Sequence, residues 1–153
     1  VAFWVNEARK ARNLKPLDSN DLIALVARSH SLDMATRGFF AHANPDGEDA
    51  TARASKAGFT GLAGGSEGQP SLGLVENIGR VGHYASIQVV RRDGEVIRRR
   101  IRWQTEEKMA EQLVLIWMAT PAFRVNILDA SKGYLGVGVH VDREHVFATQ
   151  NFF

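Results

Sequence analysis

The chain has 153 residues, of which 44% are hydrophobic and 24% are charged, and it contains no cysteine. These fractions are typical of a soluble domain and exclude intrinsic disorder and a collagen-like fold. Because the chain has no cysteine, disulfides, thiolate zinc sites and cysteine nucleophiles are excluded as well. The net charge of +2 is too small to indicate a nucleic-acid or membrane partner by itself. We expect a single domain over residues 1–153 and no transmembrane segment, because no apolar run approaches the ~20 residues that span a bilayer.

The first third of the chain predicts helices. Residues 1–13 form a helix that begins without a cap, from which we expect a domain trimmed from a longer chain. A longer helix is predicted over residues 20–37, capped by Asp18 or Ser19. Residues at helical spacing predict its inward face: Leu22, Leu25, Val26, Ser29, Leu32 and Thr36. A short helix follows over residues 49–57 and ends at Gly58.

The middle of the chain predicts a loop and then a hairpin. Residues 60–73 are rich in glycine and predict a long surface loop. A hairpin is predicted over residues 84–103, and its turn is argued from five alternating hydrophobic residues that all have odd numbers: Ile87, Val89, Ile97, Ile101 and Trp103. They share one face only if odd residues pair with odd. A three-residue loop at 92–94 gives that register, with Val89 opposite Ile97 and Gly94 in the left-handed conformation.

The same hairpin carries most of the basic character of the chain. It holds six arginines against Asp93 and Glu95, for a net charge of +4. We expect Arg98, Arg100 and Arg102 to project together from the second face. Such residues commonly serve only to block edge-to-edge pairing. The functional alternative is contact with an anionic phospholipid, an acidic polysaccharide or nucleic-acid phosphate, without sequence-specific nucleic-acid recognition because no aromatic residues are interleaved.

The last third predicts two helices and a pair of strands. Thr105 caps a helix that extends to about residue 118, with a buried stripe of Met109, Leu113, Ile116 and Trp117. Thr120 and Pro121 open a further short helix, as a cap followed by proline at the first helical position. Residues 135–141 and 145–152 form a closing pair of strands. The predicted elements therefore mix helices and strands in an α+β class.

Several short motifs follow one another in a fixed order along nearly the whole chain. They are Val5-Asn6-x-x-Arg9, Pro16-Leu17, Phe39-Phe40-Ala41-His42-x-x-Pro45-x-Gly47, Glu76-Asn77-Ile78, Trp117-Met118-x-x-Pro121, Arg124-x-Asn126-Ile127-Leu128, Gly136-Val137-Gly138-Val139 and Thr149-Gln150-Asn151-Phe152. Their ordered set resembles the CAP superfamily (cysteine-rich secretory, antigen 5 and pathogenesis-related 1 proteins) in a prokaryotic form without disulfides. The resemblance implies a three-layer α-β-α sandwich that is extracellular or at the cell envelope. The hairpin at 84–103 is outside the usual pattern, and we expect it to be an insertion.

The resemblance also implies a central cleft that in many members holds two histidines and two glutamates, sometimes around a divalent metal. His42 matches the first histidine, and Glu76 matches the glutamate of the Glu-Asn-Ile motif, with Asn77 beside it. Phe123 stands where the second histidine normally lies. The nearest candidate for the second glutamate is Glu111, which lies about 200° around its helix from the start of the buried stripe.

A catalytic zinc site needs three protein ligands, and His42 and Glu76 supply two. We therefore expect no firmly held cofactor and at most a weakly bound zinc or magnesium ion on this pair. The favoured function is an extracytoplasmic binding or interaction module with a degenerate cleft, whose ligand is a lipid, a polysaccharide or a protein at the cell envelope. The alternatives are a Glu/His-dependent or metal-assisted hydrolase, most plausibly a peptidase, and binding of anionic lipid or polyanion by the hairpin.

Purely structural roles compete with these assignments. His42 can bond a backbone carbonyl at a helix end, and Glu76 with Asn77 can satisfy the amides of a buried loop. The remaining histidines lack the spacing of metal ligands, and we expect them to be ordinary surface or packing residues: His30, His83, His140 and His145.

Overall fold

The computed structural model describes residues 1–60 and 73–153, so most of the predicted loop at 60–73 lies outside the described residues. The helices are α1 (Ala2–Lys10), α2 (Asp21–Arg37), α3 (Ala50–Lys56), α4 (Glu106–Ala119) and α5 (Pro121–Leu128). The strands are β1 (Asp18–Ser19), β2 (Val75–Gly82), β3 (Tyr84–Arg92), β4 (Glu95–Trp103), β5 (Tyr134–Val141) and β6 (His145–Phe152).

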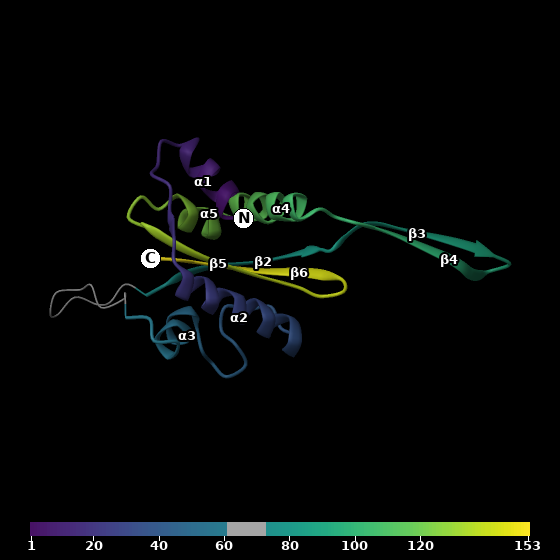
Figure 1. The fold of residues 1–153 in the computed structure, drawn as a ribbon, viewed down its shortest axis with the longest axis horizontal. Helices are drawn as coiled ribbons and strands as arrows, with labels where there is room; N and C mark the ends of the chain where they lie inside the picture. Colours follow the sequence, from purple (N-terminus) through teal and green to yellow (C-terminus); the bar gives the residue numbers. More distant parts are fainter. Residues whose placement is uncertain (61–72) are drawn as a thin grey trace.

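Four of the strands form a central sheet in the order β1-β5-β6-β2. β1 runs parallel to β5, whereas β5, β6 and β2 pair antiparallel. Helices α1, α4 and α5 cover one face of this sheet, and α2 with α3 cover the other (Figure 1). The arrangement confirms the α+β class and the three-layer α-β-α sandwich.

The core lies on both faces of the central sheet. On one face Trp117 of α4 is fully buried, and its indole N–H donates to the carbonyl oxygen of Ile78 at 2.8 Å. On the other face Ile23 and Val26 of α2 pack against Ala54 of α3. Burying a side chain of this size contributes roughly 1.5–3 kcal/mol, so the two layers are held to the sheet mainly by these contacts.

Helix α2 lies directly against the backbone of β5 at two glycines. A Cβ atom on Gly138 would be 1.9 Å from the backbone nitrogen of Arg28, and one on Gly136 would be 2.4 Å from the carbonyl carbon of Ile23. Ser31 Oγ donates to the carbonyl oxygen of Gly138 at 3.0 Å. The missing side chains therefore set the distance between the helix and the sheet.

The predicted cap of α2 is wrong. Asn20 caps the helix, because its Oδ1 accepts a hydrogen bond from the backbone N–H of Ile23 at 3.0 Å. Asp18 and Ser19 instead form β1 and pair with β5. Asp, Ser and Asn are all favourable N-cap residues, so the sequence allowed any of the three at this position. Because Asp18 and Ser19 pair with β5, Asn20 is left to cap the helix.

The predicted inward face of α2 is also wrong apart from Val26. Leu25 and Leu32 are 53% and 44% exposed. The buried face consists of Ile23, Val26, Ala27, His30, Ser31 and Met34. At the two glycines the sheet contacts the helix at Ile23, Ala24, Ala27 and Arg28, and this contact sets a buried face that leaves Leu25 and Leu32 outward.

The predictions for the later helices are confirmed in part. Thr105 caps α4 by accepting from the N–H of Lys108 at 3.2 Å, as expected. Ile116 is 43% exposed, however, and Val114 is buried in its place. Pro121 opens α5, but Thr120 does not cap it, because its hydroxyl donates backward to the carbonyl oxygen of Ile116 at 2.9 Å.

Strands β3 and β4 form a separate two-stranded sheet that projects away from the sandwich (Figure 1). Its turn has two residues, Asp93 and Gly94, with φ of 52° and 86°, so the predicted three-residue loop is wrong. Asp-Gly suits the two-residue type I′ turn, which needs positive φ at both positions.

A bulge restores the odd-with-odd pairing that the sequence pattern requires. Arg91 pairs with Val96, whereas Val90 pairs with Arg98, so one residue of β4 is extra at this point. Beyond the bulge Ile87 lies opposite Ile101. A β-bulge thus restores the odd-with-odd pairing, but Val89 lies opposite Arg99, so the predicted pairing of Val89 with Ile97 is wrong.

Candidate functional site

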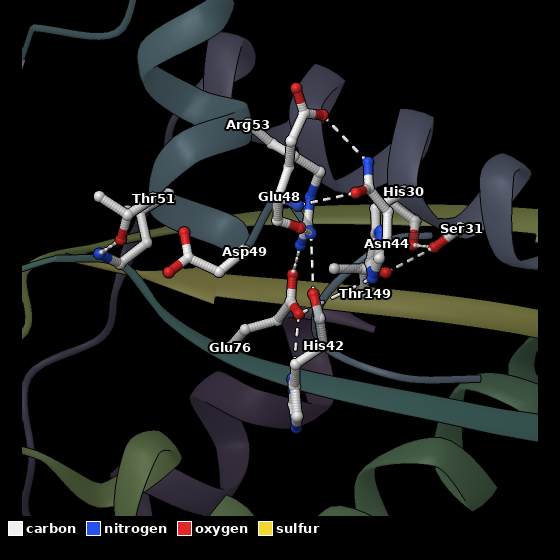
Figure 2. Close-up of polar contacts among 12 residues, drawn as sticks. His30, Ser31, His42, Asn44, Glu48, Asp49, Thr51, Arg53, Glu76 and Thr149 are labelled. Atoms are coloured by element: carbon white, nitrogen blue, oxygen red, sulfur yellow. Dashed lines mark hydrogen bonds and ion pairs between the residues drawn. The ribbon is translucent and has the colours of Figure 1, made fainter. Parts of the chain in front are cut away.

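His42 and Glu76 meet at one end of the sandwich although 34 positions separate them (Figure 2). His42 Nδ1 lies 3.0 Å from Glu76 Oε1. Because a carboxylate can only accept, the proton of this hydrogen bond is on Nδ1. The Glu76 side chain is 4% exposed and that of His42 is 50% exposed, so the pair joins a buried carboxylate to the surface.

Arg53 of α3 neutralises the buried carboxylate from the other side. Its Nη2 donates to Glu76 Oε2 at 2.5 Å. Its Nη1 donates to the carbonyl oxygens of His42 at 2.8 Å and Glu48 at 2.7 Å. One guanidinium therefore ties Glu76 to the segment that carries His42, and both carboxylate oxygens are occupied.

The segment between α2 and α3 is folded by Asn44. Its Oδ1 accepts from the N–H groups of Asp46 at 3.1 Å and Glu48 at 2.8 Å. Its Nδ2 donates to Glu48 Oε2 at 3.0 Å, and the hydrogen bond from Lys56 to the same carboxylate lowers the pKa of Glu48. This Asx turn directs the segment so that His42 faces Glu76.

His30 of α2 lies behind the pair and was not expected to be near it. Its buried Nε2 is 3.9 Å from Glu76 Oε1 and donates to the carbonyl oxygen of Ala41 at 3.0 Å. Burial lowers the pKa of His30, an effect that the charge of Glu76 opposes and that of Arg53 reinforces. The neutral ring is therefore favoured, with Nδ1 as an acceptor that has no partner within the described ranges.

Of the weaker candidates, the structure brings Phe123 to the site and leaves Glu111 outside it. The ring of Phe123 lies edge-on to His42, with centroids 5.9 Å apart. Asn77 points to the opposite face of the sheet from Glu76, where its Nδ2 donates to the carbonyl oxygen of Phe123 at 3.1 Å. Glu111 pairs with Lys108 at 2.7 Å on α4.

Two hollows flank this cluster. One of about 310 Å³ is lined by His42, Asp49, Thr51, Glu76 and Asn126, among others, and is the cleft itself. A larger one of about 500 Å³ lies between α2 and the segment that leads into α3. Arg53 lines the larger hollow and reaches Glu76 in the smaller one, so the guanidinium lies between them.

The donor set does not fit the divalent metal that the family implies in many members. Both oxygens of Glu76 already accept hydrogen bonds, the phenyl ring of Phe123 offers no lone pair, and His42, whose Nδ1 donates to Glu76, can offer a metal only its Nε2. In the part of the chain that the structure describes, no group of three His, Asp or Glu side chains is placed to hold a metal. Arg53 supplies the positive charge that a metal would otherwise bring.

The sequence matches the description "CAP: Cysteine-rich secretory protein family" over residues 4–152. The chain therefore belongs to the CAP family, which confirms the resemblance drawn from its ordered motifs. No curated protein matches the sequence at a significant level. Within residues 1–60 and 73–153, no helix has both the length and the apolar character needed to cross a bilayer.

Solved structures share the fold at low sequence identity. An extracellular protein containing a SCP domain from Bacillus anthracis is 24% identical, with a TM-score of 0.61 over 97% of this chain and 37% of that one. An outer surface protein from Borrelia burgdorferi is 14% identical, with a TM-score of 0.61 over 99% of this chain and 87% of that one. A cysteine-rich secretory protein from Staphylococcus aureus is 22% identical, with a TM-score of 0.55 over 99% and 36%.

The resemblance predicted that His42 and Glu76 lie in one cleft, and the structure brings these two side chains together. Arg53 and His30 lie on helices without any motif of that resemblance, and only the folded chain brings them to Glu76. A signal for Arg53 does exist in principle, because a buried glutamate requires a cationic partner. The sequence could not say which of its 19 lysines and arginines that partner is.

Proposed function

We propose that this CAP-family chain is a binding or interaction module that works outside the cytoplasm, with a cleft that holds no metal tightly. The observation that carries the proposal is the ion pair between Arg53 and Glu76, at 2.5 Å, with the guanidinium side chain 8% exposed. The extracellular and outer-surface descriptions of the B. anthracis and B. burgdorferi proteins support the location. The ligand that we propose for the module is a component of the cell envelope: a lipid, a polysaccharide or a protein.

The energetics of the ion pair disfavour metal binding. A cation that coordinates Glu76 competes with Arg53 for the carboxylate, and a displaced guanidinium would stay buried without its partner. Breaking a buried ion pair in this way costs roughly 3–5 kcal/mol. His42 and Glu76 would then be two ligands, too few to recover that cost, because catalytic zinc sites use three protein ligands.

Hydrolysis is the second candidate, and one observation favours it. Since His42 donates Nδ1–H to Glu76, its exposed Nε2 is left as an acceptor in the neutral ring, which is the arrangement of an oriented general base. Thr51 brings a hydroxyl to the lining of this cleft, but this hydroxyl accepts from the backbone N–H of Leu74 at 3.0 Å. A base without a nucleophile or a metal-bound water is a weak catalyst.

Calorimetric titration with zinc, cobalt and magnesium tests the proposal. We expect no micromolar binding to the native chain. Phe123→His places a second imidazole beside His42, and we expect this variant to gain zinc affinity that is lost again when His42→Ala is added. Phe123→Leu, which offers no lone pair, is the matched control and should behave as the native chain does.

Two results would contradict the proposal. One is micromolar metal binding by the native chain that disappears in His42→Ala. The other is turnover of a peptide or ester library that is lost in both His42→Ala and Glu76→Gln while the circular dichroism spectra stay native, which would establish the hydrolase instead.

A further inference from the structure

The hairpin of β3 and β4 is exposed on both faces. Every residue from 85 to 103 is exposed, and β3 and β4 pair only with each other in the described part of the chain. A two-stranded hairpin without further contacts is at best marginally stable in water. Exposed apolar residues grouped in this way usually mark an interaction surface.

The register divides the hairpin into two chemically different faces. We define the apolar face by five exposed hydrophobic residues that alternate along the two strands: Ile87, Val89, Val96, Ile101 and Trp103. The arginine face lies opposite and carries the three alternating arginines Arg98, Arg100 and Arg102, with Val90 across from Arg98, whereas Arg91 and Arg99 lie on the apolar face. The hairpin is therefore amphipathic across its thickness.

The arginine face contains a hollow suited to an oxyanion. Register places Ser86 opposite Arg102 and Gln88 opposite Arg100. These four side chains, with Ile101, line a hollow of about 310 Å³. Each arginine thus has a neutral hydrogen-bonding side chain across from it, and guanidinium groups bind phosphate oxygens in a bidentate manner.

We propose that this hairpin docks on an anionic phospholipid surface, with the apolar face toward the acyl chains and the arginine face among the phosphates. The inference deepens the proposed binding role and rests on it, because it names the partner. A soluble polyanion would cover the arginine face and leave the apolar face in water. A second copy of the hairpin would bring together two segments that each carry a net charge of +4.

The depth of docking is limited by the backbone. The outer edges of β3 and β4 present unpaired N–H and C=O groups, which do not enter the hydrocarbon region. The hairpin therefore lies in the headgroup layer. Trp103 at its base is an aromatic residue of the type that prefers this interface, and Arg91 and Arg99, which share the apolar face, have stems long enough to reach the phosphates.

Vesicle flotation tests the proposal, with phosphatidylglycerol–phosphatidylcholine vesicles compared with phosphatidylcholine alone. We expect binding to the anionic vesicles only, weakened by added salt. Arg98→Gln, Arg100→Gln and Arg102→Gln together should reduce the partition coefficient on the order of a hundredfold, at about fivefold per arginine. The matched control neutralises three exposed arginines outside the hairpin, Arg12, Arg28 and Arg124, and should keep most of the binding.

The apolar face has its own test. Ile87→Ser with Ile101→Ser should lower the partition coefficient by about tenfold or more. Leu115→Ser with Val125→Ser, at exposed positions of α4 and α5, is the control and should have little effect. Brominated lipids should quench Trp103 fluorescence, and the quenching should vanish in Trp103→Phe although Trp4 and Trp117 remain.

Three results would overturn the proposal. They are no binding to anionic vesicles, vesicle binding that survives the triple arginine variant, and binding of soluble polyphosphate with no effect of the isoleucine pair on vesicles. The last result would show that the hairpin binds soluble polyanions and not a membrane surface. Metal titration tests the cleft and flotation tests the hairpin, so each idea can fail while the other stands.

Discussion

Glu76 is a buried carboxylate, and such a charge is tolerated only when it is paired and hydrogen-bonded. Arg53 and His42 provide that pairing, one on each oxygen. The same two contacts that stabilise the carboxylate also withdraw it from metal coordination. At the scale of the residue, the contacts that stabilise the carboxylate are therefore the ones that, in our proposal, keep a metal from binding it.

We predict that His30 makes the stability of the fold depend on pH. Burial lowers its pKa in the folded chain, against the opposing charges of Glu76 and Asp33, whereas the unfolded chain titrates near the ordinary value of about 6.5. Below that pH the unfolded state binds the extra proton and the folded state resists it. The free energy of unfolding should therefore fall as the pH is lowered from 7.5 to 5.5, as measured by urea denaturation.

His30→Gln provides the control for this pH effect. Glutamine keeps an N–H donor for Ala41 and does not titrate, while the other four histidines of the chain still do. The variant should lose part of the pH dependence between 7.5 and 5.5. An unchanged dependence would show that His30 is not the group responsible.

At the scale of the element, local patterns predicted the helices and the strands β3 to β6, but they missed β1 and β2 and mispredicted the buried face of α2. Thr105 and Pro121 mark helix starts by local chemistry, and the structure confirms both positions. The buried face of α2 was mispredicted because it depends on the two glycines of β5, which are distant in sequence. The turn of the hairpin was mispredicted because a bulge and a longer loop satisfy the same odd-with-odd pattern.

The hairpin is an element that the sandwich does not need, and we propose that it is an insertion into a single domain. No residue of 84–103 belongs to the core clusters of the described residues. Its base is closed by the N–H of Gln104, which donates to the carbonyl oxygen of His83 at 3.1 Å. Replacing 84–103 by Asn-Gly should leave the circular dichroism melt within a few degrees of native, since an Asn-Gly turn fits such a closure.

Failure of the shortened chain to fold would contradict this view of the hairpin. The shortened chain should also lose binding to anionic vesicles, whereas its response to metal ions should be unchanged. Its loss of vesicle binding with a native melt would assign the membrane contact to the hairpin without disturbing the cleft.

At the scale of the whole molecule, the motif order predicted the family and, through the resemblance, the sandwich. The motif order could not predict the distance between each helical layer and the sheet. That distance depends on backbone contacts such as that of Gly138 with Arg28, which no local pattern encodes.

Gly138→Ala should push α2 away from the sheet. The new Cβ would be 1.9 Å from a backbone nitrogen, so the helix itself must move. Overpacking of this kind costs about 3 kcal/mol, and we expect a loss of that order in the free energy of unfolding by urea. Gly133→Ala, where a Cβ would meet nothing within 4 Å, is the control and should be close to neutral. Equal stability of the two variants would refute the argument.

The order of the strands has a consequence for how the protein is made. In the described part of the chain β2 has β6 as its only strand partner, and β6 is synthesised long after it. Until β6 has left the ribosome, Glu76 sits on a strand with no neighbour, and the buried ion pair cannot close. The cleft is therefore among the last features of a nascent chain to mature, and contacts this distant in sequence also make folding slow.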